Sequence, residues 1–169
     1  QVAEQLTKME TLSEALRSGR LTGSGGQPIT TLVNIGIGGS DLGPAMACEA
    51  LWPWHQQGLS CHFVSNIDPA HLHRTLQGLD PRTTLFIVAS KSFRTAETLT
   101  NAAAARIWLE QAGIDGEAIR HHFIATTSQP DRAVDFGIQA DHILPMHDWT
   151  GGRFSLWSGI GLPLAMMVG

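Results

Sequence analysis

The sequence predicts an α/β fold, a three-layer αβα sandwich that is doubly wound around a five-stranded parallel sheet. Short apolar runs alternate with helical segments along the chain, and this alternation is typical of a parallel sheet covered on both faces. Right-handed crossovers then place helices on either side of the sheet. We expect strands over residues 31–37, 61–65, 84–89 and 122–125, with a very short fifth strand over 142–144.

Helices are expected between these strands. Residues Val2 to Arg17 carry apolar side chains three and four positions apart, which predicts one apolar helical stripe. A Gly- and Ser-rich loop over 19–28 follows, so we expect a helix and linker over 1–28 before a single domain over 29–169. Further helices are expected over 41–51, 69–76, 95–112, 130–136 and 155–168.

Composition limits the classes of function. Hydrophobic residues make up 43% of the chain, which indicates an ordered globular domain, and the net charge of −4 argues against a nucleic-acid surface. The apolar stretch Leu162 to Val168 is far shorter than the roughly 20 residues that a membrane span needs. Cys48 and Cys61 lack metal-ligand spacing and fit a reducing, cytoplasmic setting. The first residue is not Met, and we expect the chain to be part of a longer protein.

The first expected strand ends in a glycine-rich segment, Gly36 to Asp41. Glycines let a backbone approach a ligand closely, and a helix start favours an anion. Asp41 occupies the place of the final glycine of a dinucleotide fingerprint, and no Gly-Lys-Ser/Thr follows for a nucleotide phosphate loop. Two interpretations stay open: a ligand loop, or a tight turn with Ser40 or Asp41 as helix N-cap.

The third expected strand ends in Ser90-Lys91-Ser92-Phe93-Arg94-Thr95. Hydroxyls, a lysine and the free N–H groups of a helix start suit a phosphate monoester. The alternative is an ordinary capping sequence with Thr95 before good helix formers and solvated cations. The density of donors favours the phosphate interpretation.

A third segment, Asp148 to Ser155, places Arg153 after two glycines. An arginine held there could stabilise an oxyanion in a cleft. The segment by itself favours the plainer interpretation of a surface arginine. The eight histidines show no metal-ligand grouping, and we expect the five tryptophans to be packing groups.

Together these segments resemble the glucose-6-phosphate isomerase family. The matching text is NIGIGGSDLGP at 34–44, FVSNID at 63–68, SKSFRTAET at 90–98, WTGGRFSLWS at 149–158 and IGLP at 160–163. Each piece is common, but the combination and its order are highly specific.

The resemblance implies a sugar isomerase (SIS) domain. Such enzymes interconvert glucose 6-phosphate and fructose 6-phosphate through a cis-enediol(ate), in glycolysis and gluconeogenesis, without a metal or organic cofactor. They are cytoplasmic homodimers whose small-molecule partner is the sugar phosphate. The family's arginine maps onto Arg153 as the catalytic residue that stabilises the enediolate. Its substrate-binding residues map onto Gly39, Ser40, Ser90, Lys91, Ser92, Thr95 and Gly152.

The sequence also departs from the family. Ser92 and Arg94 stand where threonines are commoner, and the first change keeps the hydroxyl donor. The family's base glutamate in a Glu-Ser-Asn-Gly motif, its ring-opening histidine and its lysine near the C-terminus have no counterpart in these 169 residues. Because proton transfer between two carbons needs a positioned base, we expect the isolated chain to be inactive.

Two other functions remain as alternatives. A non-catalytic SIS module that senses phosphosugars would keep the Ser90 segment but would not need Arg153. A dinucleotide-dependent oxidoreductase would need glycine in place of Asp41 and an acidic residue after the second strand, for which Asp68 gives weak support.

Overall fold

Five parallel strands form the central sheet of the computed structural model, which describes residues 2–169. Their spatial order is β2-β1-β3-β4-β5, and every neighbouring pair is parallel. The predicted fold class is therefore confirmed. Each strand lies within two residues of its expected limits: β1 (Thr31–Ile35), β2 (Ser60–Val64), β3 (Thr84–Ala89), β4 (Phe123–Thr127) and β5 (Ile143–Pro145).

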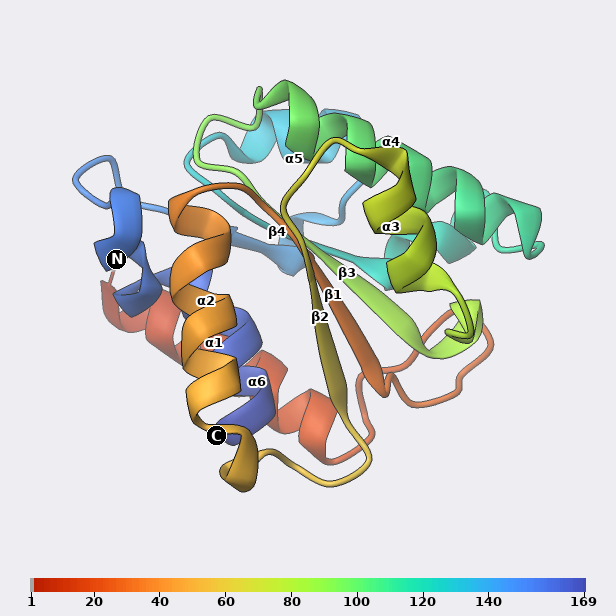
Figure 1. Ribbon diagram of the computed structural model, residues 1–169, viewed down its shortest axis with the longest axis horizontal. Helices are drawn as coiled ribbons and strands as arrows, with labels where there is room; N and C mark the ends of the chain where they lie inside the picture. The colour runs from red at the N-terminus through yellow and green to blue at the C-terminus, as the bar shows by residue number, and fades with distance from the viewer. Residues whose placement is uncertain (1) are drawn as a thin grey trace.

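Helices cover both faces of the sheet (Figure 1). One face carries α1 (Val2–Arg17), α2 (Gly39–Ala50) and α6 (Leu162–Val168). The other carries α3 (Pro69–Leu76), α4 (Ala96–Gln111) and α5 (Pro130–Phe136). The sandwich is thus doubly wound.

The strand order reverses direction between β1 and β3. The chain runs from β1 outward to β2 and then crosses back over β1 to reach β3. In an open parallel sheet, such a reversal opens a crevice at the carboxyl ends of the two strands. Ile35 pairs with Val88, so the loops after β1 and β3 begin side by side.

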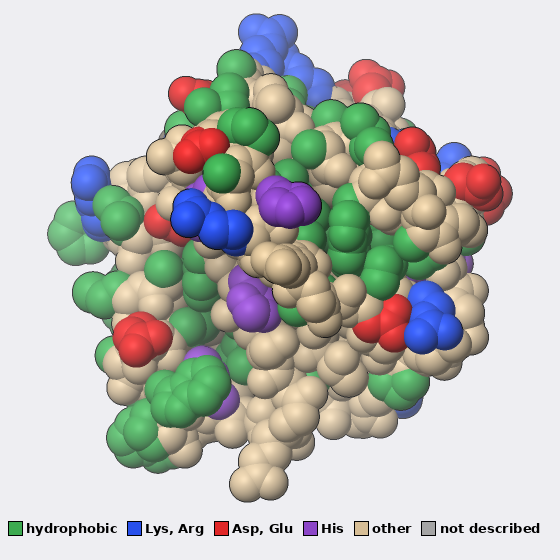
Figure 2. Space-filling view, turned by 45° about the vertical axis from the view of Figure 1, so that its right-hand side comes forward, with side chains coloured by type: hydrophobic (Ala, Val, Ile, Leu, Met, Phe, Trp, Pro, Cys, Tyr) green, Lys and Arg blue, Asp and Glu red, His purple; other side chains and the backbone are tan. Residues whose placement is uncertain are grey.

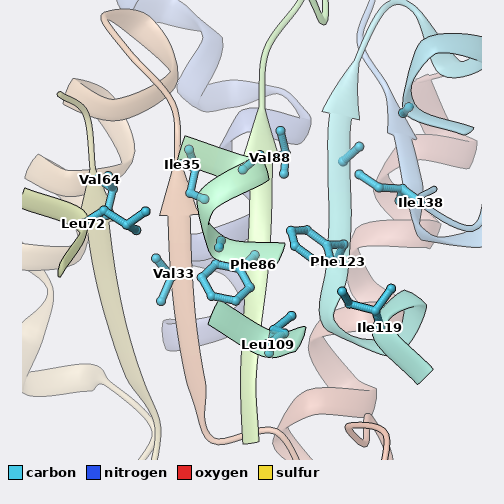
Figure 3. Close-up of a cluster of buried hydrophobic side chains, with 14 of the residues drawn as sticks. Val33, Ile35, Val64, Leu72, Phe86, Val88, Leu109, Ile119, Phe123 and Ile138 are labelled. Carbon is cyan, nitrogen blue, oxygen red and sulfur yellow. The ribbon is translucent and has the colours of Figure 1, made fainter. Parts of the chain in front are cut away.

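Alternating side chains of the strands feed two apolar layers. Phe86 and Val88 pack beneath α3, α4 and α5, whereas Leu85 and Ile87 pack against α1, α2 and α6. Figure 3 shows the first layer, in which the rings of Phe86 and Phe123 stack with their centroids 5.4 Å apart. All residues of β1 and β3 are buried, as expected for central parallel strands.

The apolar stripe predicted for α1 is only half right. Leu12 and Leu16 are buried, but Val2 and Leu6 are exposed. At this end of the helix Gln5 is buried instead, and its side-chain amide donates a hydrogen bond to the carbonyl of Pro145 at the end of β5. A polar tie to the edge strand therefore replaces the expected apolar contact.

The helix predicted over 155–168 is wrong in its first half. Residues Gly152–Trp157 and Gly159–Gly161 form 3₁₀ turns, and the α-helix begins only at Leu162. Pro163 sits in the first turn, where its missing N–H costs nothing, so it starts the helix rather than interrupting it. Gly161 is needed because a Cβ there would lie 2.3 Å from the carbonyl oxygen of Leu156.

The tryptophans are mostly not packing groups, which corrects the expectation. Trp52, Trp54, Trp149 and Trp157 are between 64% and 84% exposed, and Trp108 packs against the core beside Phe86.

Charged side chains of both signs are interspersed over the face in Figure 2. No helix in the described part of the chain is long and apolar enough to cross a membrane.

His122 joins the N-terminal loop to the sheet. Its ring is fully buried, Nδ1 lies 2.8 Å from the carbonyl oxygen of Thr84, and Nε2 accepts a hydrogen bond from the N–H of Ser24 at 2.9 Å. These partners fit a neutral ring with its proton on Nδ1. Burial lowers the pKa of His122 from its ordinary 6.5, the nearby His121 lowers it further, and the bond to Thr84 partly offsets this.

This histidine predicts a pH-dependent stability. Because the folded state holds the ring neutral, the unfolded chain binds more protons below pH 6.5, and stability falls as the pH drops through that value. The loss is at most about 1.4 kcal/mol per pH unit. Urea unfolding at about pH 7.5 and about pH 5.5 should show a smaller pH effect in His122→Gln. An equal effect in both proteins would contradict this role.

Candidate active site

The loops after β1 and β3 open into one cavity of about 430 Å³. It lies at the carboxyl ends of the strands, where the strand order reverses. Five of the residues predicted to bind substrate line it: Ser40, Ser90, Lys91, Ser92 and Thr95. Segments fifty residues apart in the sequence therefore share one site.

The β1 loop is shaped by a glycine with positive φ and by a buried asparagine side chain. Gly38 has φ +57° and precedes α2 without a side-chain cap, so the alternative with Ser40 or Asp41 as N-cap is wrong. Both residues instead lie in the first turn of α2. The side-chain amide of Asn34, fully buried in β1, donates to the carbonyl of Ser40 at 3.1 Å and fixes this turn.

Asp41 is turned away from the cavity. Its carboxyl group is mostly buried, with Ser65 and His71 nearby, and its Oδ1 has no hydrogen-bond partner in the described chain. Burial raises the pKa of this group, while Ser65 and His71 lower it. Asp41 thus belongs to the contact between the start of α2 and the end of β2.

The β3 loop is built around Phe93. Its φ of +47° is unusual for a bulky side chain, and the ring is buried against Phe136 with the centroids 6.0 Å apart. This conformation turns the chain sharply between β3 and α4. Thr95 is the N-cap residue of α4, as the capping alternative expected, but its hydroxyl accepts no capping hydrogen bond and lies 3.1 Å from that of Ser90. The Thr95 side chain therefore does not cap the helix N–H groups.

Backbone N–H groups of this loop are left without partners. In the described chain, no acceptor pairs with the N–H groups of Lys91, Ser92, Arg94 or Thr95. The carbonyl of Lys91, in contrast, accepts hydrogen bonds from the hydroxyls of Thr127 and Ser128 and from the Ser128 N–H, at 2.9–3.0 Å. Unpaired donors next to hydroxyls and cations are what a bound anion would satisfy.

The cavity carries positive charge without a compensating acid. Lys91, Arg94 and Arg132 line it, and none of the described lining residues is Asp or Glu. The lysine side chain also reaches the carbonyl of Asp148 in the third predicted segment. The arrangement favours a dianionic ligand.

The third segment meets the first but not the cavity. A Cβ on Gly39 would lie 2.2 Å from the carbonyl oxygen of Gly152, so only glycine permits this approach. The Ser155 hydroxyl lies within hydrogen-bond distance of the carbonyls of both Gly39 and Gly152. Arg153 is exposed and does not line the cavity.

Residues after β4 were missed by sequence reasoning. Ser128, Gln129 and Arg132 line the cavity together with the two predicted loops. They follow β4, the neighbour of β3, so the rule that ligands sit at the carboxyl ends of parallel strands could have indicated them. Their short, mixed segment carries no recognisable motif.

Comparison with known proteins identifies the family. The phosphoglucose isomerase family model matches residues 1–169. The chain belongs to the phosphoglucose isomerase family. It is 49% identical over 169 residues to a glucose-6-phosphate isomerase of Saccharophagus degradans and 52% identical over 168 residues to one of Mesorhizobium japonicum. These alignments include 100% and 99% of this chain, but only 31% and 30% of the length of the two relatives.

A solved structure agrees with this assignment. The crystal structure of a glucose-6-phosphate isomerase from Chlamydia trachomatis superposes with a TM-score of 0.81 at 30% identity, covering 99% of this chain and 30% of that one. The chain therefore spans about a third of the length of its relatives.

The contact between Gly39 and Gly152 yields a test. In Gly39→Ala the new methyl group must displace the backbone of Gly152, which we expect to cost about 1–3 kcal/mol of stability and to weaken ligand binding. Gly151→Ala is the matched control, because its φ is −177° and its Cβ would meet open space. Urea unfolding of both variants measures the difference. Equal stabilities would contradict the close approach.

Proposed function

We propose that this chain supplies the phosphate-binding part of the active site of an enzyme that interconverts glucose 6-phosphate and fructose 6-phosphate. The observation that carries the proposal is the unpaired set of N–H groups in the β3 loop, which opens into a cationic cavity. Membership of the phosphoglucose isomerase family supports a sugar phosphate as the substrate class.

Binding would begin at the phosphate. Its oxygens would accept hydrogen bonds from the free N–H groups and from the hydroxyls of Ser90 and Thr95, while the Lys91 ammonium group offsets its charge. The sugar would then extend from the phosphate toward Ser40 at the start of α2, which lines the same cavity.

The chemical step needs groups that the cavity lining lacks. Moving a proton between C1 and C2 through an enediolate requires a base within hydrogen-bond reach. No Asp, Glu or His is among the described residues that line the cavity. We therefore propose that this chain binds and orients the substrate, and that it does not turn it over by itself.

Arg153 keeps its proposed role in the complete site. Its neighbour Gly152 lies against Gly39, next to Ser40, so the arginine is on a segment that contacts the loop beside the expected sugar position. Stabilising the enediolate oxygen would require the exposed side chain to turn toward the cavity. A base from outside these 169 residues, or from a partner subunit of a homodimer, would complete the reaction.

Titration calorimetry of the chain with fructose 6-phosphate tests the binding proposal. We expect Ser90→Ala to weaken binding by about tenfold, because a hydrogen bond to a charged group is lost. Arg153→Ala should change affinity by less than about threefold, since an exposed charge contributes little. Fructose without phosphate serves as the control ligand and should not bind.

Two results would contradict the proposal. Equal affinity for fructose and fructose 6-phosphate would exclude a phosphate site. Measurable isomerisation of fructose 6-phosphate by the purified chain would show that the base lies within it.

A further inference from the structure

Arg132 lines the cavity, but it lies in none of the three segments from which the sequence predicted a ligand site. It lies on α5, after β4, and it is half-buried. We propose that Arg132 is a phosphate-binding residue of this site and that its guanidinium group also holds the β3 loop in its binding conformation. The inference rests on the proposed function, and it extends the site to a third strand end.

The guanidinium group is already engaged with the β3 loop on one side. Its Nη1 donates a hydrogen bond to the carbonyl of Ser92 at 2.7 Å. A guanidinium group has five N–H donors, and this is the only one with a partner within the described chain. The remaining donors of a side chain that lines the cavity are free for a ligand.

The contact with Ser92 completes a pattern of backbone fixation. Thr127 and Ser128 already bind the carbonyl of Lys91, and Arg132 binds the next carbonyl. Two consecutive carbonyls are thus held from the β4 side, while the N–H groups of Lys91 and Ser92 stay unpaired. Arg132 therefore orients the same loop whose donors would bind the phosphate.

The charges around Arg132 favour an anion beside it. Lys91 and Arg94 line the same cavity, and Arg132 forms no ion pair in the described chain. Arg94 is exposed, whereas Arg132 is half-buried, so solvent screens the charge of Arg132 less. A phosphate dianion would be the missing counter-charge.

The experiment compares affinity for inorganic phosphate and for fructose 6-phosphate in three variants of the chain. Arg132→Gln can keep a donor for the Ser92 carbonyl but removes the charge. Arg132→Lys keeps the charge but loses the planar guanidinium group, whose several N–H donors can bind two partners at once. We expect affinity for both ligands to fall about tenfold in the first and about threefold in the second. Arg74→Ala is the control, with the same charge change as Arg132→Gln.

Arg74 suits this purpose because it lies on α3, outside the cavity, where its Nε donates to the carbonyl of Ala70 at 3.2 Å. Its loss should leave both affinities within about twofold, since distant exposed charges are screened. Thermal unfolding confirms that each variant is folded.

Hydrogen exchange at the amide of Phe93 separates the two parts of the role when it is measured without ligand, because this N–H is paired with the carbonyl of Ser90. Arg132→Lys should exchange faster there than the unsubstituted chain, because the bond to Ser92 is weakened. Phosphate affinity that is unchanged in Arg132→Gln, in a chain that otherwise binds phosphate, would overturn this inference alone. Absence of phosphate binding by the unsubstituted chain would overturn the proposed function and this inference together.

Discussion

The buried ring of Phe93 is the constraint on which the candidate site depends. A left-handed backbone at a bulky residue costs about 1–3 kcal/mol, and it persists only where the surroundings enforce it. Here the ring packs into the core beside Phe136, and burial of a phenylalanine contributes about 1.5–3 kcal/mol. The apolar layer beneath α4 and α5 thus holds a polar loop in a conformation that leaves its donors free.

Sheet topology then decides what this loop faces. The reversal of strand order between β1 and β3 brings the start of α2 into the same cavity, and β4 adds its own loop beside β3. Hydrogen bonds from Thr127, Ser128 and Arg132 hold the loop from one side. The unpaired N–H groups remain for the other side, so the loop is organised before any ligand arrives. Such preorganisation lowers the entropy that binding would otherwise cost.

The sequence predicts the fold class and most of the cavity, for physical reasons that concern local pattern. An uninterrupted apolar run such as Thr84–Ala89 predicts a buried strand, and every residue of this strand is buried in the structure. The clustering of Ser90, Lys91 and Thr95 reads as a phosphate loop because these donors are adjacent in the chain. The sequence does not predict non-local contacts. Arg132 comes close to the β3 loop only because β4 pairs with β3, and no pattern in its own segment indicates this contact.

Where the sequence misleads, a tertiary contact overrides a local preference. The apolar tail after Ser155 reads as one helix, but the closeness of Gly161 to the carbonyl of Leu156 and the position of Pro163 delay the helix to Leu162. Exposed Trp149 and Trp157 contradict the rule that large apolar residues pack inside. These exposed aromatic side chains lie on or beside the segment that carries Arg153, the part of the proposed active site that does not reach the cavity.

The central claim is that the free N–H groups of the β3 loop bind phosphate. A nitrogen–proton NMR titration of the chain with inorganic phosphate measures this directly, because each backbone amide reports separately. The account predicts that the amide signals of Lys91, Ser92, Arg94 and Thr95 shift most and saturate together. Shifts that leave these four amides unchanged while other surface residues respond would contradict it.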